Sequence, residues 1–419
     1  MLNTYFLVLF IFKLILSKNK QGYGSVLCEL WDTTFENNSL ELPQENPFAA
    51  SSVCEARQKM PETIFTKINA AVLLYWRERN QVTTWHNHQI FSADGSKINL
   101  PHELLKDGYF LGDKLRRHYP EGLLSVLYNL GDGMVYDFIL RPQIDERLCA
   151  IEHMNKMSKG DVLVLDRGYF SYLLLYKSIE KGIHIFCRMQ HGTVNEEIKD
   201  FWDSEKTDAT IEYYPSSAVI YYLKKRKFNL DFRKIPLRLI KYSIDGEVYV
   251  CATTLVGTDY NVNDFAKLYH GRWGIEELYK ISKEFIDVED FHSRTERGVK
   301  QEVYAHLLLI NIARIFEAEA KDDLLPLNTI DKPTELKNSY WQGFCEKLQE
   351  IKINFKNCLL VVGRFLERFL LGKQLMINDW VPKVIASIKR IRYRIRFGRH
   401  YPRRSFKPGK KWMRATAVA

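Results

Sequence analysis

The stretch Asp161-Val-Leu-Val-Leu-Asp166-Arg-Gly-Tyr169 decides how the chain folds. Its apolar residues form a short continuous run, which is typical of a strand buried on both faces of a sheet. A helical pattern follows to about Lys181, and residues 183–188 are predicted to form a further strand. Upstream, residues 88–94 are predicted as a strand that ends at Asp94-Gly. This order of strands and helices predicts a mixed α/β layer.

The rest of the chain divides into regions around this layer. Residues 123–130 and 134–140 are apolar runs joined by Gly-Asp-Gly, which predicts a hairpin, and residues 144–157 suit a helix. Residues 189–263 have β texture, with Ala218–Leu223 among the predicted strands, and helical patterns return at 264–285 and 299–320. The predicted regions are a helical N-terminal region (1–85), a core (86–188 and 264–320), a β-rich insertion (189–263), and a helical C-terminal region with a basic tail (321–419), within which 321–340 is a linker.

Charge is unevenly distributed over the 419 residues. The net charge is +10, yet the segment from Pro382 onward contains 13 Lys and Arg residues and no acidic residue. The rest of the chain therefore has a slight acidic excess, which excludes a uniformly basic DNA-packaging protein. The tail is predicted to bind a polyanion.

The apolar start, residues 1–20, is predicted to be a buried helix. No basic residue precedes the apolar run, Lys13 interrupts it, and it is too short to span a bilayer. We therefore expect a cytoplasmic protein with no membrane partner.

Three carboxylates stand out by their positions. Asp94 and Asp166 end predicted strands, and Glu276 lies on a predicted helix, so the three can converge. Mg²⁺ or Mn²⁺ prefers oxygen ligands and keeps several waters, so these carboxylates suffice for a site. Two such ions can activate a water or 3′-hydroxyl and stabilise the leaving oxygen of a phosphodiester.

The helix that carries Glu276 has further polar residues on the same side. Arg272, Glu276 and Lys283 lie at i, i+4 and i+11, and Tyr269 precedes them by one turn. Such a stripe suits a metal ligand flanked by phosphate contacts. Simpler interpretations stay open for each residue alone: a turn at Asp94-Gly, a helix cap at Asp166, and a solvated Arg–Glu pair on the helix.

The order Asp94-Gly-Ser, Asp166-Arg-Gly-Tyr and Tyr269-x2-Arg272-x3-Glu276-x6-Lys283 resembles the DDE transposases of bacterial insertion sequences. Within them it is similar to the group named after insertion sequence four. The flanking segments Ser51–Met60 and Phe291–His306 are also similar to family segments.

This resemblance implies a ribonuclease-H-like core with Asp94, Asp166 and Glu276 as the metal-binding triad. Tyr269, Arg272 and Lys283 would contact phosphates of the transposon end, and residues 189–263 would be an insertion domain. The implied reaction is metal-dependent cleavage at inverted-repeat ends, followed by strand transfer to target DNA. The resemblance also implies a homodimer on two DNA ends, a place at the bacterial nucleoid, and an end-recognition module longer than residues 1–85.

The insertion contains its own basic segment. Eight Lys and Arg residues lie between Leu223 and Lys241, including Lys224, Lys225, Arg226 and Lys227. Alternation with Phe228 and Phe232 predicts a β-ribbon that either contacts DNA or is merely solvated. Some relatives flip a base onto an aromatic residue; Trp202 is the candidate here, and a packed Trp is the simpler interpretation.

Three functions compete at this stage. The first is an active transposase, the second a decayed remnant that binds transposon ends without cutting, and the third a nuclease of the same fold that acts without strand transfer. The complete set of carboxylates with Arg272 and Lys283 beside them favours the first.

Overall fold

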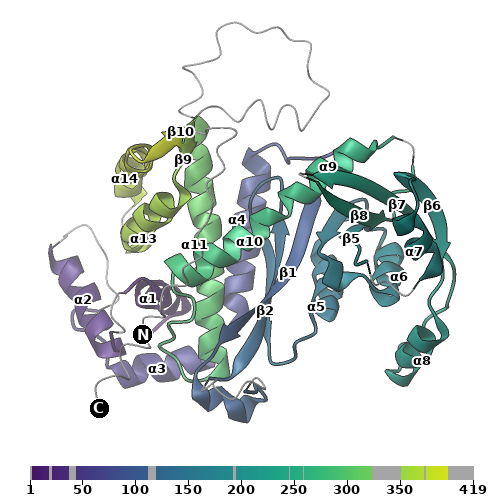
Figure 1. Ribbon diagram of the computed structural model, residues 1–419. Helices are drawn as coiled ribbons and strands as arrows, with labels where there is room; N and C mark the ends of the chain where they lie inside the picture. The colour runs from purple at the N-terminus through teal and green to yellow at the C-terminus, as the bar shows by residue number, and fades with distance from the viewer. Residues whose placement is uncertain are drawn as a thin grey trace, which may run out of the picture.

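The computed structural model describes residues 2–17, 21–36, 44–111, 119–191, 195–244, 246–257, 259–322, 351–371 and 374–394. The predicted linker, apart from its first two residues, and the basic tail beyond Arg394 lie outside this part of the chain. A single large sheet runs through the centre, and helices cover both of its faces (Figure 1).

The sheet has eight strands in the order β3-β2-β1-β4-β5-β8-β7-β6. Strands β1, β4 and β5 are parallel, and every other neighbouring pair is antiparallel. The first five strands in this order confirm the predicted mixed-sheet, ribonuclease-H-like α/β core. Their bounds are β1 Ile90–Asn99, β2 Glu121–Asn129, β3 Val135–Arg141, β4 Val162–Leu165, β5 His184–Arg188, β6 Asp208–Tyr213, β7 Ile235–Ile244 and β8 Glu247–Thr253.

Alternation along β1 and β4 assigns each residue to one face of the sheet. Phe91, Ala93, Leu163 and Leu165 pack into the core beneath α5 (Glu146–His153) and α6 (Tyr172–Lys181). Ile90, Val162 and Val164 point to the opposite face, toward α9 (Val262–Gly271). Asp94 and Asp166 continue this second set in register, so both belong to the face covered by α9 and by α10 (Trp273–Lys280).

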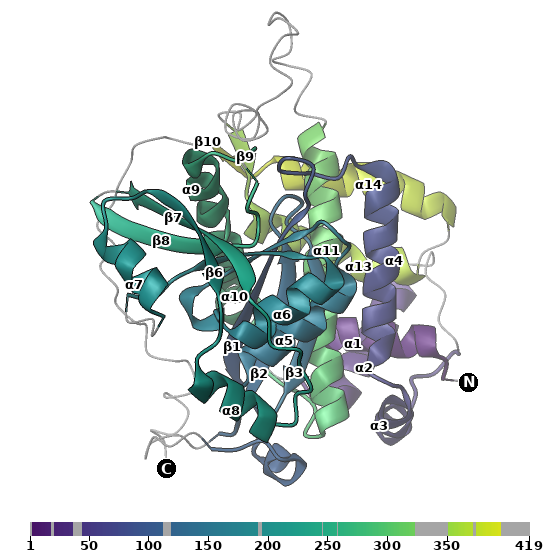
Figure 2. The same ribbon diagram turned by 90° about the vertical axis from the view of Figure 1, so that its right-hand side faces the viewer.

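The N-terminal and C-terminal helices form a layer on the α9–α10 side, where α11 crosses the middle of the molecule (Figures 1 and 2). Helices α1, α3, α4, α13 and α14 pack against α11, and α2 packs against α1 and α3. Their bounds are α1 Thr4–Leu16, α2 Tyr23–Glu36, α3 Ala50–Lys59, α4 Thr63–Arg79, α11 Glu296–Asp322, α13 Phe355–Leu371 and α14 Gln374–Lys389. A short pair, β9 (Ile351–Ile353) and β10 (Arg392–Arg394), lies beside α14.

The apolar N-terminal stretch is a buried helix, as predicted. Helix α1 begins after Asn3, whose side chain accepts a hydrogen bond from the Phe6 N–H, and eight of its residues are buried. In the described part of the chain, no helix is both long and apolar enough to cross a membrane.

The two flanking segments noted in the sequence meet in space. Arg57 of α3 is 3 % exposed and donates to Glu302 at 2.7 Å, Gln301 at 2.8 Å and the Gly298 carbonyl at 2.7 Å on α11. Gln301 returns hydrogen bonds to the carbonyls of Arg57 and Met60. This buried polar network joins the N-terminal helices to the core.

The insertion differs from its prediction in two ways. The strand predicted at Ala218–Leu223 is wrong, because these residues lie in helix α8 (Ser217–Lys225), which Ser216 caps. The predicted β-ribbon after Leu223 is also wrong: the basic segment is the end of α8, a connection without regular structure, and β7. Strands β6, β7 and β8 extend the core sheet, whereas α8 stands away from it (Figures 1 and 2). Helix α7 (Glu196–Asp203) packs on β7.

Candidate active site

Asp94 lies inside β1 rather than at its end, so both the predicted strand end and the turn interpretation are wrong. Pairing between β1 and β4 stops at Ser92–Val164, two residues before Asp94, while pairing with β2 continues. The strands therefore separate where the carboxylate is. Tyr279 of α10 shares its hydroxyl hydrogen between the Asp94 carbonyl at 2.7 Å and the Leu124 carbonyl at 3.0 Å, which fixes α10 on β1 and β2, at one side of this gap.

Asp166 is the first residue after β4 and lies on the other side of the same gap. Its side chain caps no helix, since Ser171 caps α6, so the capping interpretation is wrong. The Tyr269 hydroxyl donates to Asp166 Oδ1 at 3.2 Å. The Cys187 thiol on β5 donates to the Asp166 carbonyl at 3.2 Å and holds the backbone in place.

The predicted single helix over 264–285 is broken into α9, α10 and a π-helical turn, η4 (Ile281–Phe285). Helix α9 begins with a reciprocal capping box between Asn261 and Asp264. A π turn adds a residue to one helical turn, so Lys283 leaves the direction expected from regular spacing. Its ammonium donates to the Lys97 carbonyl on β1 at 2.6 Å.

Arg272 occupies the centre of the site. It is only 7 % exposed, its guanidinium lies 5.5 Å from the Tyr269 ring centroid, and it donates to Glu276 Oε1 at 2.5 Å. Burial acts to lower the pKa of Arg272, but Tyr269, Glu276 and Asp166 together raise it. Among the described residues, its Nε makes no hydrogen bond. The Arg–Glu pair exists, but it is not a solvated face.

Repulsion and burial act together on Asp94. Burial raises the pKa of its carboxyl to about 6, and the negative charges of Glu146 and Asp166 add to the rise. The Gly95 N–H and the Arg272 guanidinium act in the opposite direction. Arg272 thus interacts with all three predicted carboxylates, which makes it the common counter-ion of Asp94, Asp166 and Glu276.

The three predicted carboxylates are neighbours of one arginine, yet they do not form a ready-made coordination sphere. Among the residues that the structure describes, no three His, Cys, Asp or Glu side chains lie close enough to hold a metal ion as they stand. The Glu276 side chain is 53 % exposed and turned to Arg272. The all-oxygen donor set, with carboxylates that repel each other, fits a hard divalent cation.

One charged neighbour of Asp94 was missed by sequence reasoning. Glu146, the first residue of α5, adds to the raised pKa of Asp94 and is itself acted on by Asp166. Nothing in the sequence marks it, because an acidic residue in a first helical turn is common. His153 at the other end of α5 fixes this helix to the sheet through Ser125 at 3.0 Å and Asp137 at 2.8 Å.

The remaining predicted residues lie in the insertion. Lys224, Lys225, Arg226 and Lys227 are all exposed at the end of α8. Arg226 reaches Asp145, the neighbour of Glu146, at 3.5 Å, which brings this basic segment to the carboxylate side of the core. Trp202 is half-buried against the core, and Lys241 donates to its carbonyl at 2.8 Å. A more exposed tryptophan, Trp273 at 56 %, lies one turn before Glu276.

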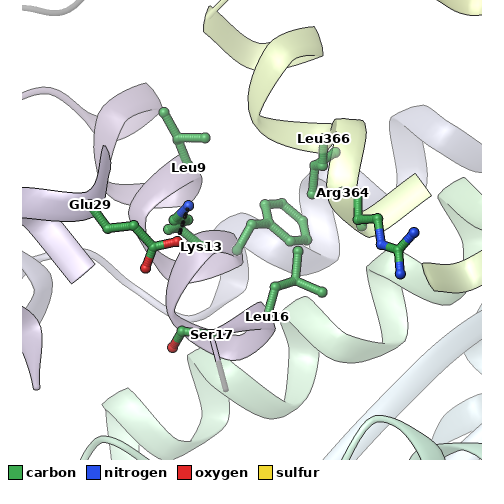
Figure 3. Close-up of a pocket in the computed structure, with 9 residues that line it drawn as sticks. Leu9, Lys13, Leu16, Ser17, Glu29, Arg364 and Leu366 are labelled. Carbon is green, nitrogen blue, oxygen red and sulfur yellow. Dashed lines mark ion pairs between the residues drawn. The ribbon is translucent and has the colours of Figure 1, made fainter. Parts of the chain in front are cut away.

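A cavity of about 270 Å³ lies elsewhere, between α1, α2 and α13 (Figure 3). Its walls are mostly apolar, and the Lys13 ammonium at its edge is paired with Glu29 at 3.0 Å. It offers no convergent carboxylates and is therefore a packing feature.

Comparison with known proteins decides the family. The family model described as the transposase DDE domain matches residues 85–312, more than half of the chain. The chain belongs to the DDE transposase family. Membership of this family implies a transposition enzyme, and DDE transposases generally use divalent metal ions.

Other comparisons add little to this family assignment. No curated protein matches the sequence. Among solved structures, a cryo-EM structure of the piggyBac transposase synaptic complex with hairpin DNA matches with a TM-score of 0.40 and 9% identity. That match covers 90% of this chain and 85% of the other, and it is too remote to carry an argument.

Proposed function

We propose that this DDE transposase cuts DNA at the inverted-repeat ends of its own insertion sequence and transfers the freed ends to target DNA, with the help of divalent cations. The observation that carries the proposal is the position of Arg272: one buried guanidinium interacts with Asp94, Asp166 and Glu276, which come from a strand, a strand end and a helix.

In this proposal Asp94, Asp166 and Glu276 hold Mg²⁺ or Mn²⁺, two ions in all. Bound divalent ions lower the pKa of a coordinated water or hydroxyl and stabilise the charge that develops on the phosphate oxygens. The chain itself separates β1 from β4 to open the gap, and Tyr279 keeps α10 on β1 and β2 beside it. Glu276 must leave Arg272 to act as a ligand, so DNA binding and cation binding are coupled at this pair.

The phosphate contacts proposed for Tyr269, Arg272 and Lys283 also require each side chain to exchange its present partner for DNA. Each now bonds to a protein oxygen: Tyr269 to Asp166, Arg272 to Glu276 and Lys283 to the Lys97 carbonyl. A DNA phosphate offers a stronger acceptor than a carbonyl and can take the second arm of the Arg272 fork, whose Nε makes no hydrogen bond in the described structure. The spacing of these residues supports membership of the group named after insertion sequence four.

We further propose that residues 189–263 act as the insertion domain of this group. Exposed Lys224, Lys225, Arg226 and Lys227 would follow the DNA backbone beyond the cleavage point, and two copies of the chain would hold two ends. Trp202 stays the candidate for base stacking, although its packing means that it must move to reach a base. The reaction would take place on bacterial DNA in the cytoplasm.

The test is cleavage of a duplex that carries the repeats flanking the gene, with Asp94→Asn, Asp166→Asn and Glu276→Gln compared with the unmodified chain. We expect each variant to bind the duplex and none to cut it. Full cleavage by a variant would remove that residue from the triad. Binding without cleavage by the unmodified chain would favour the decayed remnant. Cleavage without joining of a supplied 3′-hydroxyl end would favour the nuclease.

A further inference from the structure

Gly95, the residue after Asp94, leaves space for a side chain from another element. A Cβ at this position would lie 2.8 Å from Glu146 Cγ and 2.8 Å from Leu123 Cδ1. The backbone of Gly95 is ordinary strand, so the space, and not the conformation, requires glycine. The Asp-Gly pair, which resembles a turn in the sequence, is thus the point where Glu146 of α5 comes up against β1.

Helix α5 does not need the Glu146 side chain as a cap. The N-terminus of α5 is already capped, since Asp145 accepts the Leu148 N–H at 3.1 Å. Burial raises the pKa of the Glu146 carboxyl, and the charge of Asp166 adds to the rise. Lys97 and Arg147 lower the pKa of Glu146, but burial and the charge of Asp166 outweigh them. A charged Glu146 therefore costs stability in the cation-free fold.

Tyr169 gives an independent indication. It belongs to the Asp166-Arg-Gly-Tyr motif, it is 2 % exposed, and its hydroxyl makes no hydrogen bond of standard geometry within the described residues. Burial raises its pKa, and Asp94 and then Glu146 raise it further, so this neutral hydroxyl faces both carboxylates. The same hydroxyl acts on the Glu146 carboxyl as a hydrogen-bond partner and lowers its pKa, so Tyr169 orients Glu146, although the contact falls short of standard hydrogen-bond geometry in the described structure.

We propose that Glu146 is a fourth carboxylate of the cation site, held against β1 by the absence of a side chain at Gly95 and oriented by Tyr169. The inference rests on the proposed role of Asp94 and Asp166 as cation ligands. A hard cation takes six or more oxygen ligands, so a site with Asp94 and Asp166 has room for one more carboxylate, bound directly or through water. The same cation relieves the repulsion among the three groups.

The alternative is that Glu146 only favours the start of α5 through the helix dipole, a contribution of about 0.3–1 kcal/mol. Removal of its charge would then lower the melting temperature slightly and leave cation binding unchanged. The two roles therefore differ in a measurement that needs neither DNA nor catalysis.

The experiment is binding of Mn²⁺ alone to the full chain, followed by electron paramagnetic resonance of the free ion. We expect Glu146→Gln to weaken Mn²⁺ binding by about tenfold or more, as loss of a ligand or of its supporting partner does. Glu152→Gln is the matched control: it removes the same charge from the same helix, on the side chain that pairs with Arg141, and Mn²⁺ affinity should change less than about twofold. Asp94→Asn reports on the site itself.

The outcomes separate the two proposals. Unchanged Mn²⁺ affinity in Glu146→Gln together with weak binding in Asp94→Asn would overturn this inference alone. Unchanged affinity in Asp94→Asn would overturn the proposed ligands of the transposase. Gly95→Ala gives a second route, because its methyl group must displace Glu146: it should weaken Mn²⁺ binding, and the double variant with Glu146→Gln should be little worse than either single one. Additive losses would contradict the proposal.

Discussion

Two buried arginines in this molecule have opposite surroundings. Arg57 bonds to Glu302, Gln301 and the Gly298 carbonyl, and both charged partners are almost fully buried. Arg272 bonds to one glutamate that is 53 % exposed, has a buried Nε without a hydrogen bond in the described structure, and lies near carboxylates that it only partly neutralises.

The difference separates a structural network from a site. Arg57, Glu302 and Gln301 all bond to one another or to nearby carbonyls, and the buried polar atoms without a hydrogen bond beside them are ring nitrogens of His292 and His306. Around Arg272 the protein leaves one donor and several carboxylate oxygens for groups that the chain does not supply. Buried polar groups normally have partners, so such unsatisfied groups point to function. The pairs Arg57–Glu302 and Arg272–Glu276 can therefore be compared directly by mutation.

Glu276→Gln should have the largest effect, and it should be on activity alone. Loss of a carboxylate ligand from a two-metal site is expected to reduce DNA cleavage by about 10³-fold or more, which is about 4 kcal/mol in the barrier. Since Glu276 is half-exposed, the free energy of unfolding should change by less than about 0.5 kcal/mol. Cleavage assays and urea unfolding on the same preparation measure both. A large loss of stability would show that the two pairs are alike.

Arg57→Met should have the complementary effect. It leaves Glu302 buried and without its cation, and we expect a loss of about 3 kcal/mol in the free energy of unfolding. This is the low end for a broken buried pair, because the His292 N–H still donates to Glu302 at 2.9 Å. Mn²⁺ affinity of the folded protein should be unchanged. Weak Mn²⁺ binding at temperatures where the variant is folded would show that the Arg57 network also supports the cation site.

The sequence predicted one of these networks and not the other, for a physical reason. The spacing of Tyr269, Arg272 and Glu276 and the position of Asp166 after a buried strand are local patterns, and the site was predicted from them. Contacts between elements far apart in the sequence are not visible in this way. Arg57 meets Glu302 across 245 positions, and Glu146 reaches Gly95 only because β3 and α5 return the chain to β1.

Local patterns also misled the prediction where tertiary packing or helix capping decided the structure. Asp94-Gly has the composition of a turn, yet pairing with β2 keeps it extended. The apolar run Ala218–Leu223 suits a strand, but Ser216 starts a helix there. The π turn around Lys283 could not be inferred from spacing, because spacing arguments assume regular helix geometry.

The two networks should respond to pH in opposite directions. The pKa of Asp94 is raised to about 6, so the cation-free fold binds a proton that the unfolded chain has lost, and stability falls as pH rises from about 4 to 6. Asp94→Asn should remove this loss, which amounts to about 3 kcal/mol at pH 7. The pKa of Glu302 is lowered by Arg57 and His292 against burial, so its contribution is present near neutral pH and is lost in acid. Urea unfolding of the unmodified chain and of Asp94→Asn, in chelator at pH 4.5 and pH 7, tests this. If the free energy of unfolding changes equally between the two pH values in both proteins, the assignment for Asp94 is refuted.

The smallest effect is expected for exposed lysines that belong neither to the Arg57 network nor to the surroundings of Arg272. Lys224, Lys225 and Lys227 at the end of α8 are exposed, so they neither stabilise the fold nor lie in the site. If they follow the DNA backbone, the triple change to Ala should weaken binding of a repeat-containing duplex by about tenfold. It should also reduce the slope of log affinity against log salt by about two to three, because fewer counterions are released. Lys156, Lys159 and Lys181 provide the matched control, since they are exposed at the amino end of β4, opposite the carboxylates. Equal slopes for the two triple variants would show that DNA does not run from the carboxylates toward α8. A slope reduced only in the α8 variant would place the duplex across Asp145 and Glu146, the surface that Arg226 already reaches.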